Sequence, residues 1–163
     1  MGDAGIFRAC GGYQFMAAKK LNLDNFLPYR LSIASNALSS RIAAEYENRF
    51  GLKIPEWRLM AVLGEGQPKT QRELVEATRM DKVTVNRAAK ALADRQLIAR
   101  QAHEADGRSH HLDLTETGRS LYDAIVPAAL ASEAQLESNI SAGERATLMA
   151  ILAKLTAAAE DYG

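Results

Sequence analysis

The chain of 163 residues is poor in several features that would point to other classes of protein. Its single cysteine, Cys10, excludes a disulfide framework within the chain and fits a reducing compartment. Aromatic residues make up only 6% of the chain while alanine is abundant, which favours helices over a β-sandwich. No uninterrupted apolar run approaches the roughly 18–20 residues of a membrane span. We therefore expect a helical, cytoplasmic protein without a membrane partner.

The formal net charge is zero, but the charges are not evenly spread. Residues 69–108 carry nine Lys and Arg against six Asp and Glu, whereas residues 112–163 carry three against eight. A basic central segment can bind a polyanion locally without making the whole molecule adhesive. Ordinary solvated helix faces give the same pattern, so composition alone leaves both interpretations open.

Apolar periodicity predicts the elements of the first third of the chain. Residues 1–22 show weak periodicity and are expected to be a flexible arm. A long amphipathic helix is predicted from Leu27 to about Phe50, ending at Gly51, because apolar residues recur every three or four positions at Leu31, Ala34, Leu38 and Ile42. Pro55 then opens a second helix, because proline is tolerated in a first helical turn.

The middle of the chain changes from helical to strand periodicity. Thr70 and Glu73 form a capping box that starts a short helix ending near Thr78. Asp81 caps the next helix, whose predicted buried face consists of Val85, Ala88, Ala89 and Leu92. The stretch "LIARQAHEADGRSHHLDL" that follows has apolar ends around a polar, glycine-containing tip, which indicates a β-hairpin.

Two further helices are predicted after the hairpin. The first begins at Thr115 and extends to about Ile140, with a break or kink at Pro127. A second capping box, Ser141 with Glu144, starts the last helix. That helix carries an apolar stripe, which needs a partner surface, at Leu148, Ile151, Leu152 and Leu155.

Two short helices followed at once by a hairpin predict a winged helix-turn-helix, in which the second helix enters the DNA major groove. The outward face of that helix is polar and basic, with Lys82, Thr84, Asn86, Arg87 and Lys90. Arginine can pair bidentately with guanine and asparagine with adenine. Thr70 and Gln71, at the start of the preceding helix, are two further candidates for DNA binding. A solvent-exposed amphipathic helix is the alternative explanation of this face.

The predicted hairpin also carries a polar cluster, namely His103, Glu104, Asp106, His110 and His111. Metal binding is not expected, because adjacent histidines on a strand point to opposite faces and a flexible tip is a poor cage. Arg108 is the stronger candidate, since a tip arginine can enter a narrow minor groove while Asp106 orients its guanidinium. No catalytic constellation accompanies the cluster, so we expect neither an enzyme nor a cofactor.

The segment "TQRELVEATRMDKVTVNRAAKALADRQLIARQAHEADGRSHHLDLTETGRSL" resembles the core of the MarR family of winged-helix transcriptional regulators. The resemblance extends over roughly residues 25–160 and implies an obligate homodimer that binds a pseudo-palindromic double-stranded DNA operator. It assigns Asp106 and Arg108 the same roles at the wing. The expected fold is mainly α with a small β-hairpin wing. Its parts are an arm (1–22), a dimerisation helix (23–54), a winged helix-turn-helix lobe (55–114) and C-terminal dimerisation helices (115–163).

The resemblance further implies a small aromatic or anionic effector bound between the DNA lobe and the dimerisation helices. The candidates here are Tyr29, Arg30, Arg41 and Trp57, and an aromatic acid or its CoA thioester is the expected effector. The expected function is that of a ligand-responsive repressor. The alternatives are a winged-helix protein-interaction module, a cysteine-based redox sensor and, least supported, a small-molecule enzyme.

Two positions depart from the family's pattern. The usual glycine between the recognition helix and the wing is Gln96, which must adopt another cap or a left-handed conformation. Pro28 stands where some hydroperoxide sensors of this family carry a reactive cysteine. Cys10 lies in the arm instead, with only Arg8 nearby in sequence to lower its pKa.

Overall fold

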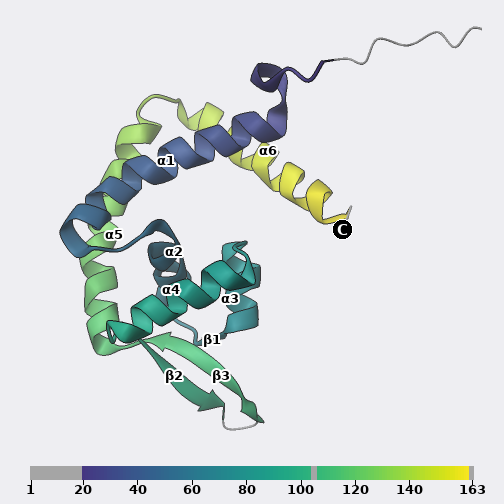
Figure 1. Ribbon diagram of the computed structural model, residues 1–163. Helices are drawn as coiled ribbons and strands as arrows, with labels where there is room; N and C mark the ends of the chain where they lie inside the picture. Colours follow the sequence, from purple (N-terminus) through teal and green to yellow (C-terminus); the bar gives the residue numbers. More distant parts are fainter. Residues whose placement is uncertain (1–19, 104–105, 162–163) are drawn as a thin grey trace, which may run out of the picture. The chain divides into compact units, whose positions relative to one another are not determined.

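The computed structural model describes residues 20–103 and 106–161, without the side chains of residues 102–109. The described chain is mainly helical with one small antiparallel sheet, as predicted (Figure 1). Its elements in order are η1 (Leu23–Asn25), α1 (Leu27–Phe50), α2 (Ile54–Gly64), β1 (Lys69–Thr70), α3 (Gln71–Thr78), α4 (Lys82–Asp94), β2 (Ile98–His103), β3 (Asp106–Leu114), α5 (Glu116–Glu137) and α6 (Ala142–Asp161). None of the described helices is both long and apolar enough to cross a lipid bilayer.

The chain divides into two compact units, residues 1–34 and residues 35–163, with the boundary inside α1. In the first unit, η1 is a short 3-10 turn whose Asn22 side chain accepts a hydrogen bond from the Asp24 amide at 2.9 Å. Cys10 and the proposed arm up to residue 19 lie outside the described residues.

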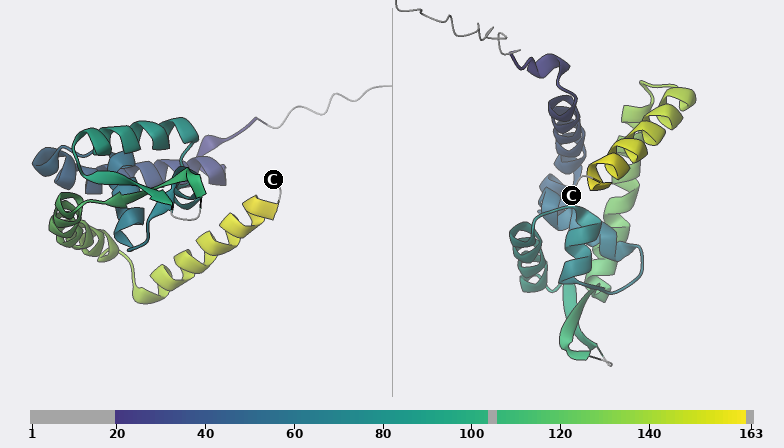
Figure 2. Two further views of the ribbon diagram at one scale, coloured as in Figure 1. Left: turned by 90° about the horizontal axis from the view of Figure 1, so that it is seen from below. Right: turned by 90° about the vertical axis from the view of Figure 1, so that its right-hand side faces the viewer.

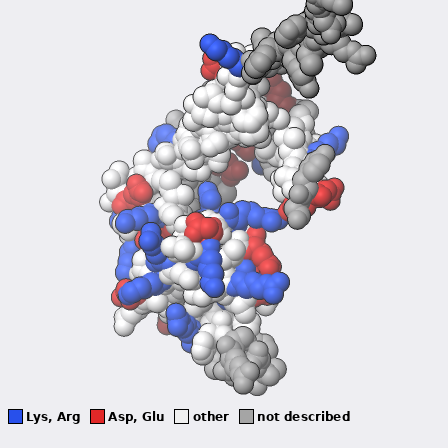
Figure 3. All heavy atoms as spheres, turned by 45° about the vertical axis from the view of Figure 1, so that its right-hand side comes forward, with Lys and Arg blue, Asp and Glu red and all other residues white. Residues whose placement is uncertain are grey.

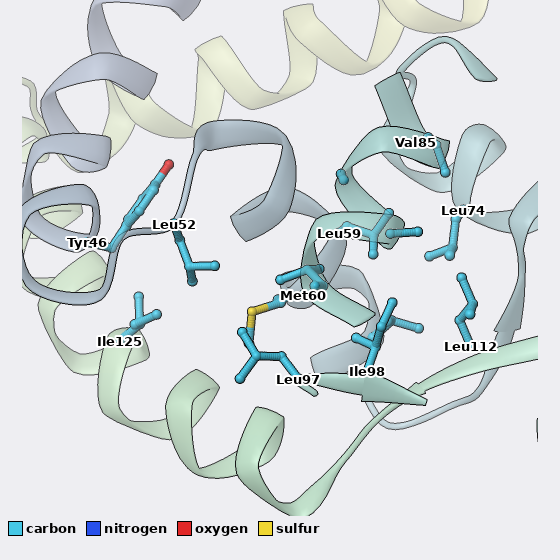
Figure 4. Packing of buried hydrophobic residues seen from close by; sticks show 14 of the residues in the cluster. Tyr46, Leu52, Leu59, Met60, Leu74, Val85, Leu97, Ile98, Leu112 and Ile125 are labelled. Carbon is cyan, nitrogen blue, oxygen red and sulfur yellow. The ribbon is translucent and has the colours of Figure 1, made fainter. Parts of the chain in front are cut away.

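The core of the second unit takes residues from α1, α2, α3, α4, β2, β3 and α5 and from the connections that follow α1 and α4 (Figure 4). α2 supplies Leu59, Met60 and Leu63, and α4 buries the four-residue face predicted for it, while α3, β2, β3 and α5 supply one residue each. Full burial of a leucine side chain stabilises the fold by roughly 1.5–3 kcal/mol. The helix-turn-helix is therefore rigidly held from its inner side, which leaves its outer face free for binding.

The sheet has three strands in the order β1-β3-β2, and both pairings are antiparallel. β2 and β3 form the predicted hairpin, which projects beyond the helices of the lobe (Figures 1 and 2). β1 was not predicted, because two residues are too short to show strand periodicity. It pairs Lys69 with Leu112 and Thr70 with His111, and so ties the start of α3 to the wing.

The predicted helix starts are confirmed by their caps. The Thr70 hydroxyl accepts from the Glu73 amide at 3.2 Å while the Glu73 carboxylate accepts from the Thr70 amide at 2.7 Å. Asp81 accepts from the Thr84 amide at 2.9 Å at the start of α4. Ser141 and Glu144 form the second predicted capping box. These bonds lower the pKa values of Glu73, Asp81 and Glu144 below the ordinary carboxyl range, because each ionised form is the better acceptor.

Of the break or kink expected at Pro127, the break does not occur, because α5 continues through that residue to Glu137 as one helix. Proline removes the hydrogen bond that residue 127 would donate to the carbonyl of Asp123. Both residues are exposed, so water can satisfy that carbonyl and the helix is not interrupted. α5 also ends three residues earlier than predicted, where Ser138 forms the C-cap before a short turn.

Gln96 adopts the left-handed conformation that its position demands, with φ of 57°. The Gln96 amide donates to the Ala93 carbonyl and the Leu97 amide to the Leu92 carbonyl, both at 2.9 Å, which is the Schellman pattern at the end of α4. The Thr115 hydroxyl donates to the Gln96 carbonyl at 2.7 Å and fixes the turn from outside. The recognition helix therefore passes into the wing through a defined turn although the usual glycine is missing.

Replacing Gln96 by glycine is expected to stabilise the protein by roughly 1 kcal/mol, because glycine removes the cost of a left-handed side-chain-bearing residue. Urea denaturation measures the difference in unfolding free energy. Gln96→Asn is the graded control, since asparagine tolerates this conformation better than glutamine. A destabilised Gln96→Gly would mean that the glutamine side chain itself holds the turn.

Candidate nucleic-acid interface and ligand cavity

The outer face of α4 presents most of its predicted DNA-binding side chains to solvent. Lys82, Asn86, Arg87 and Lys90 are exposed, on the side of the helix opposite its buried residues. Blue Lys and Arg side chains gather over the lobe in Figure 3, with single acidic side chains between them. The helix-turn-helix thus carries the basic surface that the charge distribution predicted.

Several candidate side chains on this face already have partners. The Thr84 hydroxyl donates to Asp81 at 2.6 Å and the Thr70 hydroxyl to Glu73 at 2.8 Å, so both threonines are helix caps. Lys90 pairs with Asp94 at 2.7 Å across one helical turn. DNA phosphates would have to compete with that carboxylate for the Lys90 ammonium group.

Arg95, which sequence reasoning did not single out, anchors the far end of α4. Its guanidinium donates to the carbonyls of Phe50 at 2.8 Å and Gly51 at 3.0 Å, where α1 ends. The carbonyls at the C-terminus of a helix lack partners within the helix and favour a cation. Arg95 therefore ties the recognition helix to the end of α1.

The wing candidates lie on the return strand. Asp106 pairs with His103 where β3 begins, and Arg108 lies two residues further along β3. The tip was expected at "DGR", whereas β2 ends at His103 and β3 already begins at Asp106, so both wing candidates belong to β3. The side chains of Asp106 and Arg108 lie outside what the structure describes. Among the described residues, no group of three or more His, Cys, Asp and Glu side chains is placed to hold a metal ion.

A cavity of about 210 Å³ lies between α1 and α2. Apolar and aromatic side chains, one serine and one cation surround it, namely Ser39, Ile42, Tyr46, Ile54, Trp57, Arg58 and Ala61. The Tyr46 and Trp57 ring centroids are 5.5 Å apart, so these two rings form an aromatic wall. A guanidinium beside aromatic rings suits a small planar anion.

Behind this wall, a second aromatic contact connects the cavity to α5. Trp57 stacks on Tyr122 with ring centroids 5.8 Å apart. Arg119 lies over the Tyr122 ring and donates to the Gly64 carbonyl at 2.8 Å, at the end of α2. The single tryptophan of the chain is thus packed between α1 and α5.

Of the four effector candidates from the sequence, Trp57 lines the cavity. Arg41 bonds with Glu45 at 3.2 Å and with Gln135 at 3.5 Å, while Arg58 is the cation at the cavity. Tyr29 and Arg30 are exposed residues of the first unit. Sequence reasoning missed Arg58 and Tyr46. Their signals were the adjacency of Arg58 to Trp57 and the helical spacing from Ile42 to Tyr46.

Burial, with a smaller contribution from Glu47, raises the pKa of the Tyr46 phenol to about 12. Between about pH 10 and pH 12 the unfolded chain releases this proton while the folded protein keeps it, so stability falls as the pH rises. The expected loss is roughly 1.4 kcal/mol for each pH unit in that window. Urea denaturation at about pH 9 and about pH 11 measures it.

Tyr46→Phe is the matched control because it removes only the ionisable hydroxyl. Its stability should fall less than that of the wild type between the two pH values, since the remaining tyrosines are common to both proteins. Parallel losses in the two proteins would contradict a raised pKa at Tyr46.

Comparison with known proteins places this geometry among DNA-binding regulators. Residues 50–109 match the sequence model of the MarR family. The HTH-type transcriptional repressor NicR of Pseudomonas putida is 30% identical over 104 residues, which are 64% of this chain and 66% of the repressor. The chain thus spans just under two thirds of the length of that relative.

Solved structures agree in fold. A MarR/EmrR family transcriptional regulator from Acinetobacter sp. ADP1 is 26% identical, with a TM-score of 0.80 over 86% of this chain and 99% of its own. BpsR of Bordetella bronchiseptica, whose DNA binding is regulated by 6-hydroxynicotinic acid, is 23% identical, with a TM-score of 0.71 over 80% of this chain and 98% of its own. The helices and sheet of the described chain therefore form an arrangement that recurs in these regulators.

Proposed function

Because the chain belongs to the MarR family of transcriptional regulators, we propose that it is a ligand-responsive, dimeric repressor. It acts in the cytoplasm by binding a pseudo-palindromic operator and is released by a small aromatic acid. The observation that carries the proposal is α4, whose buried face is fixed in the core while its opposite face exposes Asn86, Arg87 and two lysines. An α-helix of this kind fits the major groove.

DNA recognition is tested by selecting binding sequences from a pool of randomised duplexes and measuring affinity by fluorescence anisotropy. We expect two half-sites about one helical turn, or roughly 10 base pairs, apart. Arg87→Ala should reduce discrimination between a selected and a scrambled duplex by roughly 5- to 150-fold. Arg87→Lys keeps the charge but loses the bidentate geometry, so it should lose discrimination while retaining affinity for scrambled DNA.

Equal affinity of the wild type for selected and scrambled duplexes would refute sequence recognition. A lobe that does not bind DNA at all would favour a protein-interaction module instead. The wing is tested in the same assay, because Arg108→Ala should weaken binding most where the minor groove is narrow.

Dimerisation is supported by large apolar side chains that remain exposed on the helices outside the DNA lobe. On α6 these are Leu148, Met149 and Ile151, which are 46%, 54% and 48% exposed, and α1 adds Leu38 at 48%. No residue of α6 is buried within the chain. A second copy of the same helices would cover these surfaces.

Sedimentation equilibrium tests the assembly. The wild type should sediment as a dimer, and Ile151→Asp should shift it toward the monomer because a carboxylate would be buried without a partner. Ala157→Asp, a change to the same residue at an exposed position on the opposite side of this helix from the apolar stripe, is the control and should remain dimeric. A monomeric wild type would refute this part of the proposal.

We propose that the effector binds in the cavity between α1 and α2, where Arg58 would pair with its carboxylate and Trp57 with its ring. The cavity is smaller than the roughly 300–1,000 Å³ of drug-sized ligand sites, so it suits a single-ring acid. A CoA thioester could place only its acyl group there. Tyr29, Arg30 and Arg41 stay candidates for contacts outside the cavity.

Titration of 6-hydroxynicotinic acid and benzoic acid against the fluorescence of Trp57, the single tryptophan, tests this site. Binding should quench or shift the emission, and Arg58→Ala should weaken it about tenfold or more. Arg41→Ala provides the comparison, because Arg41 does not line the cavity. If neither acid changes the emission or the DNA affinity, both acids are excluded as effectors of this protein.

Release from DNA would follow by a shift in population between lobe positions. Ile42 and Tyr46 line the cavity on α1, and Arg95 connects the end of the same helix to α4. A ligand that prefers one position of α1 would thereby change the spacing of the two recognition helices.

A further inference from the structure

One large apolar side chain, Val83, is exposed on the first turn of α4. It is 57% exposed, whereas Val85, Ala88, Ala89 and Leu92 of the same helix are buried. A valine at this place contributes nothing to the core, and it does not take part in the cap that Asp81 and Thr84 form. Its neighbours in sequence are Lys82 and Thr84.

The helical position of Val83 puts it at the outermost part of α4. Residues three, four and seven positions apart lie on one face of a helix, so Val83, Arg87 and Lys90 form one stripe. This stripe is opposite the buried face that begins at Val85. Val83 is also the member of the stripe nearest the N-terminal end of the helix, which is the end that contacts base edges in helix-turn-helix proteins.

We propose that Val83 is a specificity-determining residue that contacts the C5-methyl group of a thymine in each operator half-site. The inference rests on the proposed function, because it requires α4 to enter the major groove. The thymine methyl is the apolar feature of the major-groove edge, and valine has no hydrogen-bonding group to read any other. Arg87 on the same stripe would contact a neighbouring base pair.

The surroundings of Val83 suit nucleic acid better than a protein partner. The apolar spot is framed by Lys82, Arg87 and Lys90, and no acidic residue lies between Val83 and Lys90 along the stripe. Between α3 and the start of α4, a groove of about 400 Å³ is lined by Gln71, Arg72, Val75 and Lys82. Two cations beside this groove offer contacts to the phosphates that flank a base pair.

The test compares duplexes with thymine and with deoxyuridine, which lacks only the methyl group. A duplex selected by the wild type from a randomised pool has its thymines replaced one at a time, and affinities are measured for wild type, Val83→Ala and Lys82→Ala. We expect one thymine per half-site at which uracil costs the wild type roughly fourfold in affinity, the effect of one buried apolar carbon. Val83→Ala should lose a similar factor on the thymine duplex and show no preference over uracil.

Lys82→Ala is the matched control on the adjacent residue. It should weaken the thymine and uracil duplexes equally and lower the salt dependence of binding, which Val83→Ala should leave unchanged. A wild type that binds its selected duplex but is indifferent to every thymine-to-uracil change would overturn the role of Val83 alone. A uracil penalty that persists unchanged in Val83→Ala would also overturn it. Absence of any duplex binding by the wild type would overturn the proposed function and this inference together.

Discussion

Gly118→Ala is expected to destabilise the protein by roughly 3 kcal/mol or more, as overpacking against backbone does. Gly118 is buried in the first turn of α5, and a Cβ atom there would lie 1.9 Å from the Leu97 carbonyl oxygen. That oxygen cannot move aside like a side chain, because it accepts a hydrogen bond from the Thr115 amide at 3.1 Å. Relief of the clash would require α5 to separate from the start of the wing.

Gly143→Ala is the matched control for this prediction. A Cβ atom at Gly143 meets nothing within 4 Å, and the residue lies in the first turn of α6. Alanine at a helical position should stabilise slightly, by up to about 1 kcal/mol. Urea denaturation should therefore show changes of opposite sign in the unfolding free energies of the two variants. A Gly118→Ala variant as stable as the wild type would show that α5 and the wing are not held at this distance.

The Gly118→Ala substitution should also affect DNA binding, because the contact between Gly118 and Leu97 lies where the wing joins α5. Thr115 donates its hydroxyl to the Gln96 carbonyl and accepts from the Gly118 amide at 2.9 Å. The turn after the recognition helix and the start of α5 are thus held by one threonine. Loosening this junction should weaken operator binding even where the variant remains folded. The wing strands β2 and β3 both connect to it, because β2 begins just after Gln96 and β3 ends just before Thr115.

The helices were largely predictable from sequence because their signals are local. The capping boxes at Thr70 and Ser141 each need only four residues, and the buried face of α4 follows from the 3.6-residue period. For Gln96 the sequence left two possibilities open, another cap or a left-handed conformation, and the structure shows the left-handed one. Gly118 was visible only as the last residue of "LTETG", because its close approach to Leu97 depends on the folded junction.

The cavity between α1 and α2 was less predictable because it depends on which side chains of separate helices meet. The sequence analysis named Arg41 and missed Arg58, because only packing assigns Arg58 to the cavity and Arg41 to Gln135 on α5. The Tyr46–Trp57–Tyr122 contacts likewise join α1 and α2 to α5, which is far from them in the chain. Helical periodicity gives the face of each residue but not its partner.

The other large effect is expected for the cations of the recognition helix. Replacing Lys82, Arg87 and Lys90 together by alanine should lower operator affinity roughly 100-fold or more, since one bidentate arginine alone contributes about 1–3 kcal/mol. The slope of log K against log salt should fall by up to about 1.8, because each of the two lysines releases about 0.9 counterions when it contacts a phosphate, whereas Arg87 is assigned to a base pair. Lys90 should contribute less than Lys82 to this change, because Asp94 already neutralises it at 2.7 Å.

Fluorescence anisotropy over a series of salt concentrations separates the contribution of the three α4 cations from the effect of a lower net charge. Lys20, Arg49 and Lys154 are exposed residues outside the DNA lobe, and their joint replacement by alanine changes the net charge equally. That control should leave the slope nearly unchanged. Asp94→Asn should shift binding the opposite way, with tighter and more salt-dependent association, because it frees Lys90 for a phosphate. Equal slopes for the two triple variants would mean that DNA responds to the overall charge of the molecule and not to α4.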